Sequence, residues 1–211
     1  MHLRKLIFAA VVISMAAFSQ NPITADSGFQ VRYAGNLDKG ESFVNIVNDG
    51  AQGASLSGPG IGKTTGQLCI NVYTFSPDEQ MVSCCSCPVT SNGVASLSVK
   101  KDLATNTLTG FSPSSVTIKL VATSAAANAT IDCKYSAMQT LVPVVGMLAW
   151  GSTLHTQGAN LATVETPFLP ATLSAQESAR LTNMCTNIYG NGSNFGICAS
   201  CVPGALGAAK R

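Results

Sequence analysis

The stretch that decides the fold is LCINVYTFSPDEQMVSCCSC, residues 68–87. Its two ends, Leu68–Phe75 and Gln80–Cys87, have the composition of β-strands. Between them, Ser76-Pro77-Asp78-Glu79 suits a type I turn, with proline at its second position. We therefore predict a β-hairpin about this turn.

Strand-like runs also lie on both sides of this hairpin, at roughly regular spacing. In the first of them, Phe29, Val31 and Tyr33 alternate with polar neighbours, as in a half-buried strand. Turn signals of the Asn-Gly and Asp-Gly kind separate several of the runs. The pattern predicts an antiparallel β-sandwich domain over residues 26–123. Its other strands are expected at Ser42–Val47, Val94–Lys100 and Ser115–Thr123.

A smaller C-terminal part, residues 133–211, is expected to pack on this sandwich. An Ala-, Ser-, Thr- and Asn-rich connection, residues 122–129, precedes it. Two further strands are expected in it, at Val144–Thr153 and Ala162–Phe168. The expected fold class is therefore mainly β: an antiparallel β-sandwich with a smaller C-terminal part that contains one helix, held by disulfides.

The single helix is expected to begin near Ser174. Ser174 and Glu177 have the spacing of a capping box, in which each side chain accepts a hydrogen bond from the other's free backbone N–H. Apolar residues at helical spacing then share one face, and Gly190 can end the helix. The residues of that face are Leu181, Met184, Cys185 and Ile188.

The N-terminus has the three parts of a secretory signal. Arg4 and Lys5 precede an apolar run, Leu6–Phe18, and small residues stand at cleavage spacing at its end, Ala17 and Ser19. The run is shorter than the roughly 20 residues that span a bilayer. We expect residues 1–19 to be a signal peptide cleaved after Ser19, with cleavage after Ala25 as the alternative. The expected location is secreted or cell envelope, periplasmic or extracellular, with no membrane span in the mature chain.

Charge excludes one class of partner. Lys and Arg number 12 and Asp and Glu number 10, and two of the basic residues lie in the signal, so the mature chain is near neutral. Nucleic-acid binding needs a basic surface, and we therefore expect no nucleic-acid partner. Charged residues make up only 10% of the chain, against about 25% in typical domains.

All eight cysteines lie in the mature part, and an even number in an exported chain predicts disulfides. In the expected hairpin Cys69 would lie near Cys84 or Cys85. Successive strand residues face opposite sides, so Cys84 and Cys85 should have different partners. Cys185, near the helix end, is expected to bond to Cys198 or Cys201. The disulfide candidates are Cys69, Cys84, Cys85, Cys87, Cys133, Cys185, Cys198 and Cys201.

Two C-x-x-C pairs, Cys84–Cys87 and Cys198–Cys201, leave an alternative open. This spacing is typical of zinc and iron–sulfur half-sites and of redox centres. An oxidising compartment and four further cysteines favour disulfides. We therefore assign no metal ligand, but a thiol or metal protein stays among the possible functions.

Two other patterns suggest chemistry. Ser57–Thr64 differs from a P-loop at its opening glycine, but a strand pattern follows Lys63 where a P-loop has a helix, which favours a plain loop. His155 is the one histidine outside the signal, and a Ser–His–Asp triad through it would need partners distant in sequence. We assign no catalytic residue and no cofactor.

Several strings resemble a family of uncharacterised exported proteins from soil bacteria of the acidobacterial type. They are Leu68–Tyr73, Asp78–Met81 and Cys84–Cys87, then Ala149–His155 and Thr166–Phe168, and finally Leu173, Ala179–Thr182 and Gly196–Cys201. The resemblance spans most of the mature chain. It implies a bacterial envelope or extracellular setting and brings no activity, ligand or site residue.

Three functions follow from these observations. The first is an exported surface or extracellular protein that acts by binding, adhesion or assembly, with an unknown protein or glycan partner or with copies of itself. The second is a secreted hydrolase with a dispersed site that uses His155. The third is a thiol or metal protein that uses the C-x-x-C pairs.

Overall fold

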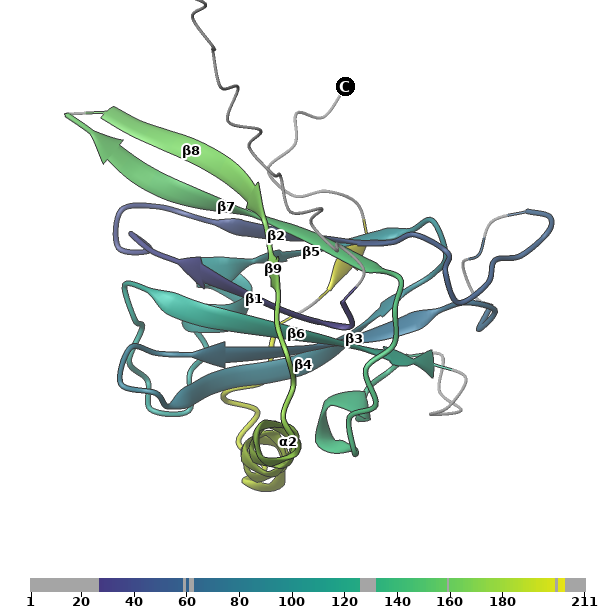
Figure 1. The fold of residues 1–211 in the computed structure, drawn as a ribbon. Helices are drawn as coiled ribbons and strands as arrows, with labels where there is room; N and C mark the ends of the chain where they lie inside the picture. The colour runs from purple at the N-terminus through teal and green to yellow at the C-terminus, as the bar shows by residue number, and fades with distance from the viewer. Residues whose placement is uncertain are drawn as a thin grey trace, which may run out of the picture.

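The protein is a β-sandwich of two five-stranded sheets (Figure 1). The computed structural model describes residues 27–58, 60, 63–125, 132–158, 160–199 and 201–203, so the expected signal peptide lies outside the described residues. All strand pairs within the sheets are antiparallel. The first sheet has the order β4 (Met81–Val89), β3 (Leu68–Phe75), β6 (Val116–Ser124), β1 (Phe29–Ala34), β9 (Leu169–Pro170). The second has the order β10 (Val202–Pro203), β5 (Val94–Ser98), β2 (Phe43–Asn48), β7 (Met147–Gln157), β8 (Asn160–Pro167).

The predicted hairpin is β3 and β4, joined by a tight turn in which the Ser76 and Glu79 amides hydrogen-bond across the loop. Its register places Cys69 opposite Pro88 and Cys84 opposite Tyr73. The expectation that Cys69 lies near Cys84 or Cys85 is therefore wrong. Cys69 lies near the end of the hairpin that is remote from the turn.

Strand β3 is buried along its whole length, on both faces. Leu68, Ile70 and Val72 face the space between the sheets and belong to the main core. Tyr73 and Phe75 face outward and belong to a second core beneath the helix. Burial on both faces explains the nearly continuous apolar sequence of this strand.

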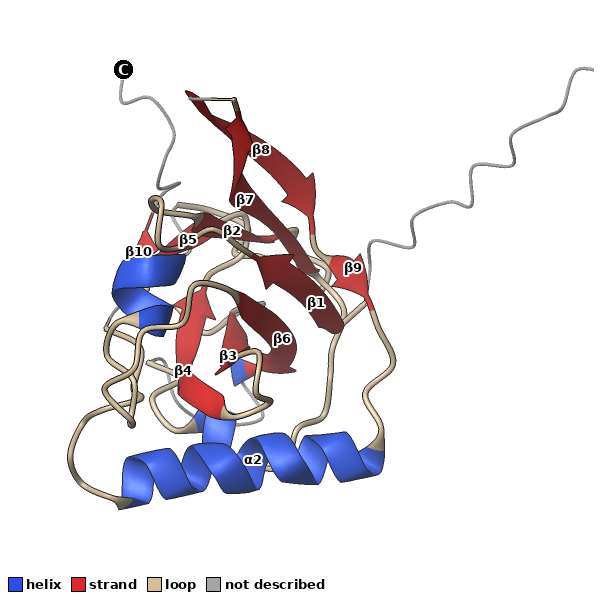
Figure 2. Cartoon of the chain, turned by 90° about the vertical axis from the view of Figure 1, so that its left-hand side faces the viewer, coloured by secondary structure: helices blue, strands red, loops and turns tan. Residues whose placement is uncertain are grey.

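Helix α2 (Ala175–Gly190) covers the outer face of the first sheet (Figure 2). Ser174 caps it as predicted, because its Oγ accepts a hydrogen bond from the Glu177 amide at 3.1 Å. The Glu177 carboxylate instead accepts from Lys119 Nζ of β6 at 2.6 Å, which ties the helix to the sheet. The buried side of α2 is Leu181, Cys185 and Ile188.

Strands from both sides of residue 123 build the sandwich. Strands β7 and β8 supply two of the five strands of the second sheet, so residues 26–123 do not form a complete sandwich by themselves. A π-helix, η1 (Val99–Ala104), follows β5 where the sequence pattern suggested that the strand continues to Lys100. Asp102 stabilises this end of the strand, since its carboxylate accepts from the Ser98 amide at 2.7 Å.

All eight cysteines form disulfides, and none is free. Cys84 and Cys85 have different partners, as the alternation of strand residues requires. The expected bond between Cys185 and Cys198 or Cys201 is absent, because the buried face of α2 brings Cys185 onto Cys84 of β4. The four pairs are Cys69–Cys133, Cys84–Cys185, Cys85–Cys198 and Cys87–Cys201.

The C-terminal segment also closes one side of the sandwich. The Cys84 amide donates to the Gly196 carbonyl at 2.8 Å, and the Cys198 amide donates to the Cys84 carbonyl at 3.3 Å, so the chain runs parallel to the free edge of β4. Strand β10 pairs with the edge of β5 in the other sheet. Among the described residues, no helix is both long and apolar enough to cross a lipid bilayer.

The double substitution Cys84→Ala, Cys185→Ala tests the anchoring of α2. This disulfide joins residues 101 positions apart, and closing such a loop stabilises a protein by about 4–5 kcal/mol in the chain-entropy model. We expect the free energy of unfolding in urea to fall by about 3–5 kcal/mol, and trypsin to cleave faster after Arg180 in the helix.

Cys69→Ala, Cys133→Ala is the matched control, because that disulfide does not involve the helix. It should also lower stability but should leave cleavage after Arg180 slow. Equal cleavage rates in the two variants would show that Cys84–Cys185 does not anchor α2.

Candidate functional site

A two-stranded arm, formed by the distal parts of β7 and β8, extends beyond the first sheet (Figure 1). Its tip is a two-residue turn that begins with Gly158, whose φ of 61° lies in the left-handed region that glycine adopts readily. Met147 and Ala149, at the base of β7, are buried between the sheets. The first sheet does not extend under the arm, because its edge strand β9 is only two residues long and pairs with only two residues of β1.

A groove with a volume of about 340 Å³ lies between the arm and β1. Five of its lining residues have largely apolar side chains. They are Val31, Tyr33, Val164, Pro167 and Leu169. Its polar lining consists of Arg32, Thr153, His155 and Thr166, and includes no carboxylate.

Arg32 crosses from the first sheet to the second and holds the base of the arm. Its Nη1 donates to the carbonyl oxygen and the Oγ1 of Thr166, both at 2.6 Å, and its Nη2 donates to Thr153 Oγ1 at 2.7 Å. The guanidinium also lies 5.9 Å from the centre of the Phe168 ring. Arg32 is only 8% exposed. It fits there because Gly151 has no side chain: a Cβ on Gly151 would lie 2.6 Å from Arg32 Cδ.

In the part of the chain that the structure describes, no carboxylate lies within ion-pair distance of the Arg32 guanidinium. Among the described residues the ion pairs are Lys39–Asp38 and Lys119–Glu177. Burial lowers the pKa of the Arg32 guanidinium below its ordinary value, and the charge of Glu165 opposes this shift. Its Nε is buried and lacks a hydrogen-bond partner. The direct contacts of this buried cation are therefore neutral oxygens and a ring, and the nearby negative charge, Glu165, lies beyond ion-pair distance.

His155 lies on the arm, exposed, and lines the same groove. No hydrogen bond joins it to the residues that the structure describes. A catalytic triad needs a carboxylate on one ring nitrogen and a serine on the other. Trp150, five residues earlier in β7, faces the opposite side of the strand.

The Gly-rich loop leads into a strand. Lys63 Nζ donates to Ser55 Oγ at 3.1 Å, and β3 begins at Leu68. No helix starts among the described residues between them, and positions 59, 61 and 62 lie outside that description. The helix N-terminus that cradles phosphates in a P-loop is thus missing from residues 63–68.

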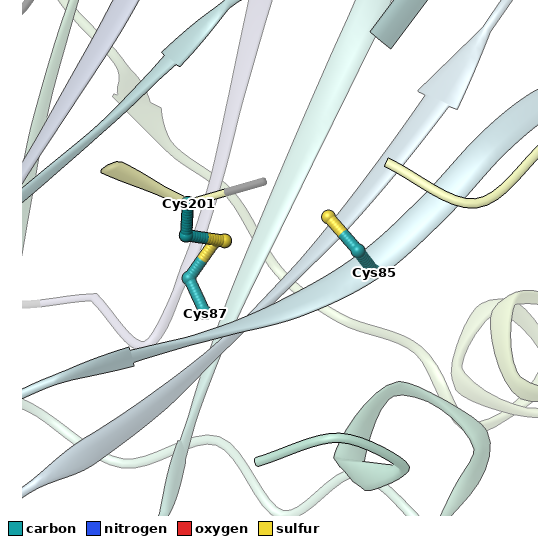
Figure 3. A group of neighbouring side chains, drawn as sticks. All are labelled: Cys85, Cys87 and Cys201. Atoms are coloured by element: carbon teal, nitrogen blue, oxygen red, sulfur yellow. A yellow bond between two sulfur atoms is a disulfide. The ribbon is translucent and has the colours of Figure 1, made fainter. Parts of the chain in front are cut away.

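Sulfur atoms gather where β4 meets the C-terminal segment (Figure 3). The Sγ atoms of Cys85, Cys87 and Cys201 lie within 4.8 Å of one another. Neither C-x-x-C pair is bonded within itself, because Cys87 is bonded to Cys201, Cys84 to Cys185 and Cys198 to Cys85. Metal ligation requires thiolates, and in these disulfides the cluster offers none.

The sequence pattern did not single out Arg32. The alternation of Phe29, Val31 and Tyr33 suggested one buried face, yet Tyr33 is 63% exposed and Arg32 is buried. An arginine between apolar residues in a strand ordinarily indicates a solvent-facing position. The burial of Arg32 becomes clear only from the packing of β1 against the distant hairpin β7–β8, in which Gly151 pairs with Thr166 and both contact the Arg32 side chain.

The chain matches no protein-family model, no curated protein and no solved structure. The groove, the arm and the disulfides are therefore the features that bear on its function.

Gly151→Ala tests the packing of Arg32. The new methyl group would displace a buried side chain, and such overpacking costs about 1–3 kcal/mol. We expect the free energy of unfolding to fall by this amount. Gly190→Ala is the control, because a Cβ there meets no atom within 4 Å. Equal stability of the two variants would contradict the tight contact between Arg32 and Gly151.

Proposed function

We propose that this protein is exported and acts through its surface, by binding a partner or by assembling with copies of itself through the edge of β8. The observation that carries the proposal is the exposure of this eight-residue edge strand, in which only Ala162 is partly covered. An exposed edge presents unpaired N–H and C=O groups to another strand. Strand addition is a common mode of binding.

The hydrogen-bond pattern identifies which backbone groups point outward. The Phe168 amide donates to the Ala149 carbonyl, so the odd-numbered residues of β7 pair with the even-numbered residues of β8. The N–H and C=O groups of Leu161, Thr163 and Glu165 therefore point away from β7. Together they span an edge long enough to receive a strand.

The other lateral edges are covered or very short. Residues 196–198 lie along β4, and β10 lies along β5. Strand β9 is two residues long. The contrast supports β8 as the edge that a partner would use.

The side chains of β8 do little to block such pairing. Leu161 is 51% exposed and Val164 is 45% exposed. Glu165 is the one charged residue of the strand, and its carboxylate accepts from Asn45 of β2. Proline, which prevents strand addition, occurs only at the last position, Pro167.

Export is supported by the four disulfides, because such bonds persist in oxidising compartments. An envelope or extracellular location suits a protein that recognises a polypeptide strand, or a glycan, at the surface of a cell.

Thr163→Pro tests the edge directly. Proline removes the outward N–H of residue 163 and leaves the bonds between β7 and β8 intact. With disulfides intact, we expect the wild-type mass in light scattering to rise with protein concentration, and the mass of Thr163→Pro to stay that of a monomer.

Thr163→Val is the matched control, since it changes the side chain but keeps the N–H. It should associate like the wild type. The proposal would be wrong if the wild type stayed a monomer at every concentration and bound no envelope polysaccharide. If it also hydrolysed an ester or a peptide in a way that requires His155, the protein would instead be a hydrolase.

A further inference from the structure

We propose that the groove beside Arg32 binds a small monocarboxylate whose body is apolar, of the size of an aryl or medium-length acyl acid. This site lies on the inner face of the arm and does not involve the outward backbone edge of β8. It is therefore independent of the proposed association.

Charge is the first reason. Arg32 is buried and forms no ion pair with the described residues, since Glu165 acts on it only from beyond ion-pair distance, and this is a costly state for a cation. A guanidinium has five N–H donors, and hydrogen bonds to the described residues use three of them. A carboxylate in the groove would supply a negative charge in direct contact with the guanidinium.

Two hydroxyl groups strengthen this preference. Thr153 Oγ1 and Thr166 Oγ1 both accept hydrogen bonds from Arg32 and both line the groove. Each hydroxyl then has its own proton left to donate. Arg32 thus orients two O–H donors next to its own charge. Each polar residue of the lining can donate a hydrogen bond and none is a carboxylate, and this set favours an anion.

The remaining walls select what the carboxylate is attached to. Val31 and Leu169 line one side and Val164 the other, with the ring of Tyr33 also exposed there. Removing an apolar body from water against these side chains is favourable, whereas the hydroxyl groups of a sugar acid would find few partners there. A volume of about 340 Å³ is at the small end of the range for ligand pockets, which suits a single ring or a short chain.

The test compares ligands that differ in one property. In isothermal titration calorimetry with the mature, disulfide-bonded protein, 3-phenylpropanoate should bind saturably at one site per chain. The neutral 3-phenylpropanamide, of the same shape, should bind at least about tenfold more weakly, because it lacks the charge-assisted bond to Arg32. Galacturonate, which has the charge without the apolar body, should also bind at least about tenfold more weakly.

Two variants and one control complete the test. Arg32→Met should reduce 3-phenylpropanoate binding at least about tenfold. Val164→Phe, which fills the groove and leaves Arg32 in place, should also reduce it, and covers the case in which Arg32→Met loosens the arm. Lys39→Met removes an exposed cation elsewhere and should bind like the wild type. Equal affinity for the amide and the acid, or wild-type binding by Val164→Phe, would overturn the proposal.

Discussion

Three disulfides on one edge strand are the constraint on which the rest of the structure depends. Strand β4 turns Cys84 outward and Cys85 and Cys87 inward, because neighbouring strand residues face opposite sides. Their partners, in chain order, are Cys185, Cys198 and Cys201. Because Cys185 lies outside the first sheet and the other two lie on its inner side, the chain after α2 must pass around the edge of β4. Along that path, Gly196 and Cys198 form backbone hydrogen bonds with Cys84, and these cover the outer edge of β4.

On the opposite side of the sandwich, none of the four disulfides involves β1, β7, β8 or β9. There the chain crosses from β8 to β9 within three residues, Pro167–Leu169, and β9 pairs with β1 only at two positions. Arg32 links the two sheets at this place through Thr153 and Thr166. Gln30 and Asn36 also donate to carbonyls of β7. The result is an asymmetric molecule: one side is covalently closed, and the other carries an uncovered arm and a groove with a buried positive charge.

The sequence predicted those parts of the fold that depend on interactions between residues close together in the chain. Turn chemistry at Ser76–Glu79 and the cap at Ser174 are examples, since both depend on residues within a few positions of each other. The disulfide partners of Cys69 and Cys185 could not be predicted in this way, because they depend on hairpin register and on the docking of α2. The site at Arg32 needs a hairpin, β7 and β8, that lies more than a hundred residues further along the chain. The two-residue strands β9 and β10 carry no periodic signal at all.

Amide hydrogen exchange, followed by NMR on dilute monomeric protein, tests this asymmetry most directly. If the account is right, the amides of Cys84 and Cys198 exchange slowly, because each is hydrogen-bonded across the stapled edge. On the arm, Thr163 and Glu165 should exchange much faster than their neighbours Ala162 and Val164, whose amides point toward β7. Equal and strong protection of all four arm amides in the monomer would show that the edge of β8 is already covered, and would contradict the account.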